Sequence, residues 1–256
     1  MDLGYFEASL DVSDIARSLA FYTRLGFEAL DGHADIRNVS LQKGDCRLGL
    51  YQGHLDPPQT QLIFWQGDVP AIAAELESRG VEFFRGPNQD ANGAAFMLKD
   101  PDGHPIFVIS LRVFHFNEPG HARPADPTPR TASGVGRPFG RFILSLASAD
   151  LDRSIAFYDK LGFKPQSRDA TTATLRNADC TIGLHQGFAR NWTQLTFWQG
   201  DVHEIAGDLT AKGLVLERGP TTNAGGAVGD GATIRDPDGH QLQFINLESL
   251  RGSAGG

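Results

Sequence analysis

The chain carries the same succession of motifs twice. The segment FWQGDV at 64–69 returns letter for letter at 197–202, and DIARSLAFYTRLGF at 14–27 returns as DLDRSIAFYDKLGF at 150–163. The landmarks keep their order and nearly their spacing, and DPDGH also occurs once in each half. A repeat unit this long excludes a solenoid of short repeats. The sequence therefore predicts two homologous domains.

The boundaries of these domains follow from composition. A Pro-rich segment between the repeats is typical of a linker, and the small residues at the end of the chain are typical of a flexible tail. We expect each half to be large enough for a core of its own. The predicted division is a first domain at 1–111, a linker at 112–138, a second domain at 139–248 and a tail at 249–256.

Charge and hydropathy exclude several classes of protein. The net charge of −8 argues against nucleic acid as a partner, because phosphates require a basic surface. We find no signal-peptide pattern at the N-terminus and no apolar stretch long enough for a bilayer, so we expect a cytoplasmic protein that does not bind membranes. Cys46 and Cys180 occupy twin positions, and two buried thiols are favoured over a disulfide.

Each half divides again into two similar units. Apolar residues spaced three and four apart predict helices near 14–25, 69–79, 150–161 and 202–212, each closed by a glycine. One short strand pattern precedes each helix and about three follow it. The fold class is therefore α+β, with four βαβββ modules paired into two domains whose mixed sheets are curved and cup-shaped.

The conserved spacing within the repeats resembles the vicinal oxygen chelate superfamily, which includes glyoxalase I, bleomycin-resistance proteins and extradiol dioxygenases. The resemblance covers both repeats and predicts glyoxalase-like domains. In the first repeat it rests on Val12, Asp14, Ser18, Phe21, Tyr22, Leu25, Gly26 and Phe27, and in the second on Ser154, Phe157, Tyr158, Leu161, Gly162 and Phe163.

The same resemblance implies a divalent metal held by His, Glu or Gln on the first and last strands of each module. The residues at those positions are Glu7, Gly49, Gln61 and Phe107 in the first repeat, and Ile143, Gly183, Gln194 and Gln243 in the second. A catalytic centre needs about three good ligands, and amide oxygens alone bind divalent metals weakly. We therefore predict no metal site of the family type and no cofactor.

Alternation along the strands predicts which side chains face each cavity. The predicted lining combines aromatic walls with neutral hydrogen-bonding groups, which suits a small planar or amphipathic organic ligand. The alternative that Trp65 and Trp198 only fill a core stays open. The predicted ligand-binding residues are Ser9, Arg47, Tyr51, Gln61, Trp65, Ser145, His185, Gln194, Trp198 and Gln243.

A few residues outside this predicted lining have other expected roles. Glu7 is the candidate catalytic residue if the protein is an enzyme, either as a base or as the sole strong metal ligand. His104 and His240 are expected to be polar turn residues outside the cavities. The glycine-rich segments 92–94 and 223–226 are either plain hairpin connections or flaps over a cavity.

Three classes of function remain open. The leading prediction is a glyoxalase- and bleomycin-resistance-like protein that binds a small molecule without metal, for sequestration, resistance, sensing or metal-free turnover. The alternative is a metal-dependent lyase, isomerase or dioxygenase of the same superfamily. A third is a structural protein whose cavities are filled by side chains. The sequence does not decide whether the protein is an enzyme, which cavity is used, or whether it is a monomer or a homodimer.

Overall fold

The computed structural model describes residues 1–31, 37–53, 60–111, 139–221 and 231–246. The predicted linker 112–138, the tail 249–256 and the segment 223–226 lie outside the described residues. So do four of the eight histidines: His33, His54, His115 and His121.

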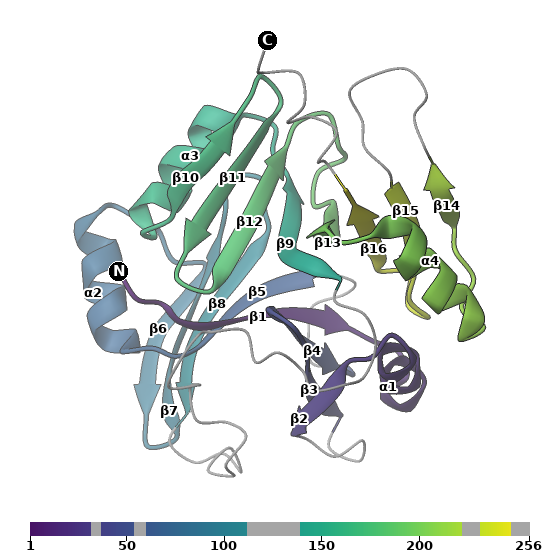
Figure 1. Cartoon of the computed structure of the whole chain (residues 1–256). Coiled ribbons are helices and arrows are strands. Elements are labelled where there is room, and N and C mark those ends of the chain that lie inside the picture. Colours follow the sequence, from purple (N-terminus) through teal and green to yellow (C-terminus); the bar gives the residue numbers. More distant parts are fainter. Residues whose placement is uncertain (32–36, 54–59, 112–138, 222–230, 247–256) are drawn as a thin grey trace.

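The first half forms one eight-stranded mixed sheet in the order β2-β3-β4-β1-β5-β8-β7-β6 (Figure 1). The two modules join where β1 pairs antiparallel with β5. The elements are β1 (Gly4–Asp11), α1 (Ile15–Arg24), β2 (Glu28–Asp31), β3 (Asn38–Lys43), β4 (Cys46–Tyr51), β5 (Thr60–Gln66), α2 (Val69–Ser78), β6 (Arg85–Asp90), β7 (Gly93–Lys99) and β8 (Pro105–Leu111).

The second half repeats this topology, with strand order β10-β11-β12-β9-β13-β16-β15-β14. The βαβββ module is therefore present four times, and the predicted fold class is confirmed. The elements are β9 (Gly140–Ala147), α3 (Leu151–Lys160), β10 (Lys164–Arg168), β11 (Thr172–Asn177), β12 (Cys180–His185), β13 (Thr193–Gln199), α4 (Val202–Ala211), β14 (Arg218–Thr221), β15 (Gly231–Arg235) and β16 (Gln241–Ile245).

The four helices lie where the sequence predicts them. Each begins after an aspartate whose carboxylate accepts a backbone N–H of the first turn, as Asp68 does from Ala71 and Asp201 from Glu204. Each is followed by a glycine in the left-handed region, as at Gly26, where φ is +88°. The segment around Asn92 is the plain turn between β6 and β7.

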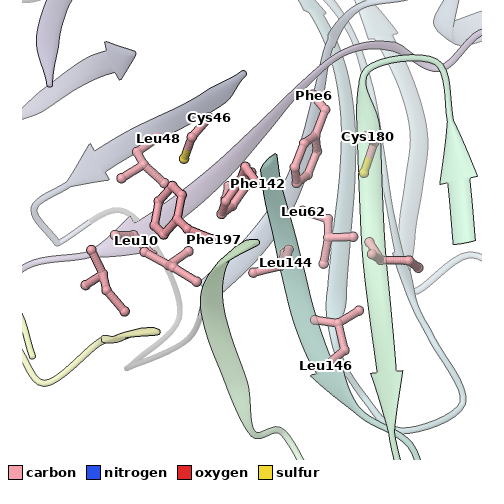
Figure 2. Packing of buried hydrophobic residues seen from close by; sticks show 14 of the residues in the cluster. Phe6, Leu10, Cys46, Leu48, Leu62, Phe142, Leu144, Leu146, Cys180 and Phe197 are labelled. Carbon is pink, nitrogen blue, oxygen red and sulfur yellow. The ribbon is translucent and has the colours of Figure 1, made fainter. Parts of the chain in front are cut away.

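One hydrophobic core serves both halves (Figure 2). We expected a core for each half, but the largest buried cluster includes residues of both sheets. Its ring contacts cross from one half to the other, with centroids 6.4 Å apart for Phe64 and Phe163 and also for Phe27 and Phe139. The two cysteines are free and buried, which confirms the prediction of two thiols.

The DPDGH turn of the second half docks on helix α1 of the first. Tyr22 donates its hydroxyl to Asp236 at 3.0 Å, and Ser18 donates to Asp238 at 2.7 Å. Burial, and then the neighbouring Asp236, raise the pKa of Tyr22 well above its usual value, so the hydroxyl stays a donor. His240 Nε2 contacts the Asp11 carbonyl oxygen at 2.8 Å.

The twin turn of the first half docks on helix α3 in the same way. Tyr158 donates to Asp100 and Ser154 donates to Asp102, each at 3.0 Å. His104 is buried in this turn, 1% exposed, with Nδ1 2.8 Å from Asp100 and Nε2 3.3 Å from the Trp192 carbonyl oxygen. The repeated motif thus joins the two halves through buried, charge-assisted hydrogen bonds.

A second pair of contacts follows the same symmetry. The Asp45 carboxylate accepts the backbone N–H of Phe142 at 3.1 Å, and the Asp179 carboxylate accepts that of Phe6, also at 3.1 Å. Each aspartate lies in the hairpin turn just before the buried cysteine, so this turn of each half closes on the first strand of the other half.

Candidate ligand-binding faces

Each sheet has a face turned away from the shared core. Strand register places the predicted residues of each half together on that face, because directly paired residues point to the same side. The first outer face carries Tyr5, Glu7, Ser9, Arg47, Gly49, Tyr51, Gln61, Ile63 and Trp65. The second outer face carries Ile143, Ser145, Gly183, His185, Gln194, Thr196, Trp198 and Gln243.

Glu7 is the centre of a buried hydrogen-bond network on the first outer face. Its Oε1 accepts from Ser9 Oγ at 3.1 Å, Tyr51 Oη at 3.0 Å and Trp65 Nε1 at 3.3 Å. Its Oε2 accepts from Ser40 Oγ at 2.7 Å. The residue is only 1% exposed, so four protein donors take the place of water around this carboxylate.

Gly49 makes this arrangement possible. A Cβ built there would collide with the Glu7 carboxylate and the Tyr51 ring, with Glu7 Cδ at 2.8 Å. Burial, and then the Glu7 charge, raise the pKa of Tyr51 well above its usual value, which keeps its hydroxyl a donor to Glu7.

The remaining predicted residues of the first face surround this network. Trp65 packs with Tyr5, Ile63 and Ile109 in a small buried cluster of its own. Arg47 holds its guanidinium 4.5 Å from the centre of the Tyr5 ring, a cation–π contact. Gln61 pairs with Ser9 across the strands and is buried.

The second outer face carries a chain of neutral polar groups instead of a carboxylate. Ser145 Oγ lies 2.9 Å from Thr196 Oγ1, which lies 3.5 Å from Gln194 Oε1. Gln194 Nε2 donates in turn to Gln241 Oε1 at 2.5 Å. Sequence analysis missed Thr196 and Gln241, although alternation from Gln194 along β13 points to Thr196.

His185 occupies the position that Tyr51 occupies in the first half. Around the Cβ that Gly183 lacks, His185 Nε2 lies at 2.9 Å, Ile143 Cγ2 at 3.3 Å and Ser145 Oγ at 3.4 Å. His185 is half-buried, and burial lowers the pKa of its imidazole, with Asp169 opposing the shift. The imidazole is therefore neutral at neutral pH, with one donor and one acceptor nitrogen.

Two aromatic residues at the rim of this face were also missed by sequence analysis. Phe188 and Trp192 stack at 4.0 Å between centroids with an angle of 17°. The His185 ring stands edge-on to both, at 6.1 Å and 6.0 Å. They lie in the loop between β12 and β13, where no strand alternation predicts the direction of a side chain.

Trp198 and Gln243 lie farther along the second face. Trp198 is half-buried and pairs with Arg141, and Gln243 pairs with Thr196.

The positions at which the resemblance implies a metal do not fit one. Glu7 is already bound by four donors, Gly49 and Gly183 offer no side chain, and Phe107 and Ile143 are apolar. In the described part of the chain, no three His, Cys, Asp or Glu side chains gather as a metal site. Three of those donors converge on Glu7 Oε1 and one on Oε2, so protein groups already compensate the charge that a cation would neutralise.

One further hollow lies elsewhere. A groove of about 200 Å³ is lined by Gly67, Asp68, Val69, Pro70, Gln89, Gly93, Ala94 and Ser110 at the start of α2. None of the predicted ligand-binding residues lines it, although Gly93 and Ala94 belong to the segment 92–94 that was a candidate flap. Among the described helices, none is long and apolar enough to cross a bilayer.

These features define a class of protein in which tandem βαβββ modules present two polar sheet faces on a common core. Residues 4–108 match the family model of the Glyoxalase/Bleomycin resistance protein/Dioxygenase superfamily. The first half of the chain therefore belongs to that superfamily, and the second half repeats its topology. No curated protein matches the chain.

Solved structures share the fold over nearly the whole chain. An extradiol ring-cleaving dioxygenase from B. fuscum is 20% identical with a TM-score of 0.61, covering 93% of this chain and 70% of that one. An Mn(II)-bound glyoxalase from Novosphingobium aromaticivorans is also 20% identical with a TM-score of 0.61, covering 94% and 81%. At these identities the likeness concerns the fold alone.

Proposed function

We propose that the chain is a glyoxalase- and bleomycin-resistance-like protein that binds a small planar or amphipathic organic molecule on the second outer face without a metal ion. Sequestration, resistance, sensing or metal-free turnover would each use such a site. The observation that carries the proposal is the convergence of His185 Nε2 and Ser145 Oγ over Gly183, where the His185 side chain is half-buried and Ser145 is buried beneath it. Placed polar groups beside aromatic rings are typical of small-molecule sites.

The first outer face supports the choice by contrast. There the equivalent space above Gly49 is filled more tightly, by the Glu7 carboxylate and the Tyr51 ring. Glu7 and Trp65 are buried, whereas His185 and Trp198 on the second face are half-buried. A ligand would have to displace hydrogen bonds to a buried carboxylate, and leaving such groups unpaired is costly. We therefore propose that this half is structural and that its metal position is degenerate.

Calorimetric titration with planar metabolites and antibiotics tests the proposal. Gln194→Ala and His185→Ala should weaken the binding of any ligand found by roughly tenfold, because each removes a hydrogen bond in a partly buried site. Gln61→Ala changes the twin amide on the first face and should leave the affinity unchanged. Treatment with a chelator should have no effect.

Three results would contradict the proposed function. Stoichiometric zinc, nickel, iron or manganese that is lost on Glu7→Ala would overturn the metal-free proposal. Turnover of hemithioacetal substrates that is lost on treatment with a chelator would do the same. Binding that depends on Gln61 and not on Gln194 would move the site to the first face.

A further inference from the structure

We propose that the Phe188–Trp192 pair is a preformed platform for the ring of an uncharged aromatic ligand, whose polar end reaches the Ser145 hydroxyl. This inference rests on the proposed function and deepens it, because it assigns the chemical class of the ligand and adds a subsite at the rim. Four observations support it: the stacking geometry, the exposure of Phe188, the anchoring of Trp192 and the neutrality of the lining.

The Phe188 side of the platform is exposed to solvent. Trp192 stacks on one face of Phe188, while Phe188 as a whole is 51% exposed and is one of few large apolar side chains of the described residues that are so exposed. A ring that stacks on this exposed side of Phe188 would continue the stack. Offset stacking of aromatic rings stabilises beyond the area that it buries.

The platform is held in place before any ligand arrives. The Trp192 carbonyl oxygen accepts the Ala147 N–H at 2.9 Å and lies 3.3 Å from His104 Nε2 of the first half. Arg190 of the same loop donates to the Asp102 carbonyl oxygen at 3.1 Å. The loop between β12 and β13 is therefore held by hydrogen bonds to the DPDGH turn of the other half. Because it is already ordered, it loses little conformational entropy when a ligand binds.

The lining selects against charged ligands. The His185 imidazole, which is neutral at neutral pH, lies beside the platform, and the hydroxyls of Ser145 and Thr196 follow it along the second face. The carboxylate that acts on His185 is Asp169, and it is bound by the hydroxyl and backbone of Thr172. The Arg190 guanidinium of the same loop donates to the Asp102 carbonyl oxygen, and Arg141 lies beside Trp198 at the other end of the strands. An ionised ligand group beside His185 and Ser145 would therefore lose hydration without an ionic partner next to it.

Three matched probes test the inference on the full-length protein by calorimetry. Naphthalene-2-carboxamide is flat and neutral, 2-naphthoate has the same shape with a charge, and decahydronaphthalene-2-carboxamide keeps the amide but lacks the aromatic rings. We expect the first probe to bind at least tenfold more tightly than either of the others.

Two variants locate the binding. Phe188→Ala should weaken the binding of naphthalene-2-carboxamide by roughly tenfold. Phe84→Ala removes the 45% exposed phenylalanine of the first half and should leave the affinity unchanged. Both side chains are at the surface, so both variants should fold.

Failure of this inference is distinguishable from failure of the proposed function. If the three probes bind equally, the platform is refuted. If Phe188→Ala has no effect while His185→Ala weakens binding, the platform is refuted and the ligand site on the second face stands. If naphthalene-2-carboxamide does not bind at millimolar concentration, the aromatic class is refuted. If binding depends on neither Phe188 nor His185, both proposals are wrong.

Discussion

At the scale of single residues, the first outer face is organised around one buried carboxylate. Glu7 accepts from Ser9, Ser40, Tyr51 and Trp65, and no cation is needed to explain its burial. Hydrogen bonds to a charged acceptor are stronger than neutral ones, so the network stabilises the centre of the first sheet.

Substitution of Glu7 should therefore reduce stability and not only activity. Glu7→Ala leaves the Tyr51 hydroxyl and the Trp65 indole N–H buried without this acceptor, and we expect the free energy of unfolding to fall by about 3 kcal/mol or more. Glu7→Gln should cost less, because its amide oxygen still accepts. Urea denaturation measures both, with the exposed Glu77→Ala as control. An alanine variant as stable as the parent would contradict the network.

Because the Lys43 ammonium is buried, we expect the free energy of unfolding to depend on pH. Its ammonium lies 4.2 Å from the Phe139 ring centre, and burial, followed by the Lys212 charge, lowers its pKa to about 8. The folded state thus disfavours the charged form relative to the unfolded chain, where the value is about 10.4. The charged side chain opposes folding below about pH 8, and this opposition disappears as the pH rises towards about 10.4.

Lys43→Met should consequently be more stable than the parent at pH 7, and the difference should shrink by pH 9.5 because the parent gains stability over that range. Urea denaturation of the two proteins at both pH values provides the measurement. Ionisation of groups that do not interact with Lys43 affects parent and variant alike. A difference that stays constant between the two pH values would show that Lys43 does not titrate in the folded protein.

At the scale of elements, the residues that carry the family resemblance hold the two halves together. Ser18 and Tyr22 on α1 meet the turn after β15, and Ser154 and Tyr158 on α3 meet the turn after β7. The helix motif of each half therefore contacts the DPDGH turn of the other half, so the same interface occurs twice in the molecule.

Removing one tyrosine hydroxyl should weaken this interface measurably. Tyr158→Phe and Tyr22→Phe each delete a buried hydrogen bond to a carboxylate, and we expect each to cost about 2 kcal/mol of unfolding free energy. The two tyrosines share no hydrogen-bond partner, so the double variant should show nearly additive loss. Equilibrium denaturation tests this. Losses below about 0.5 kcal/mol would mean that the apolar contacts alone hold the helices.

At the scale of the whole molecule, the shared core makes the two halves one cooperative unit. Phe163 of the second half touches the Phe64 ring of the first, and the buried cluster continues without a break between the sheets. Unfolding either half would expose apolar surface of the other, so we expect a single transition.

A core substitution in one half should therefore destabilise the other. Phe163→Ala should cost about 3–5 kcal/mol. In a background in which Trp192 and Trp198 are replaced by Phe, fluorescence reports Trp65 alone, and its transition should shift as far as the loss of secondary structure seen by circular dichroism. If Trp65 keeps the transition of the parent, the halves unfold independently.

The sequence by itself determined the duplicated modules, the helix limits and the sides of the strands on which Glu7, Tyr51, His185 and Gln194 lie. These features follow from local periods of 3.6 and 2 residues and from local caps, which the chain contains directly. Tertiary structure alone decided that Ser40 completes the Glu7 network, that His104 reaches Trp192 and that Phe188 stacks at a rim. Those contacts join segments far apart in sequence or lie in loops, where no period fixes the direction of a side chain.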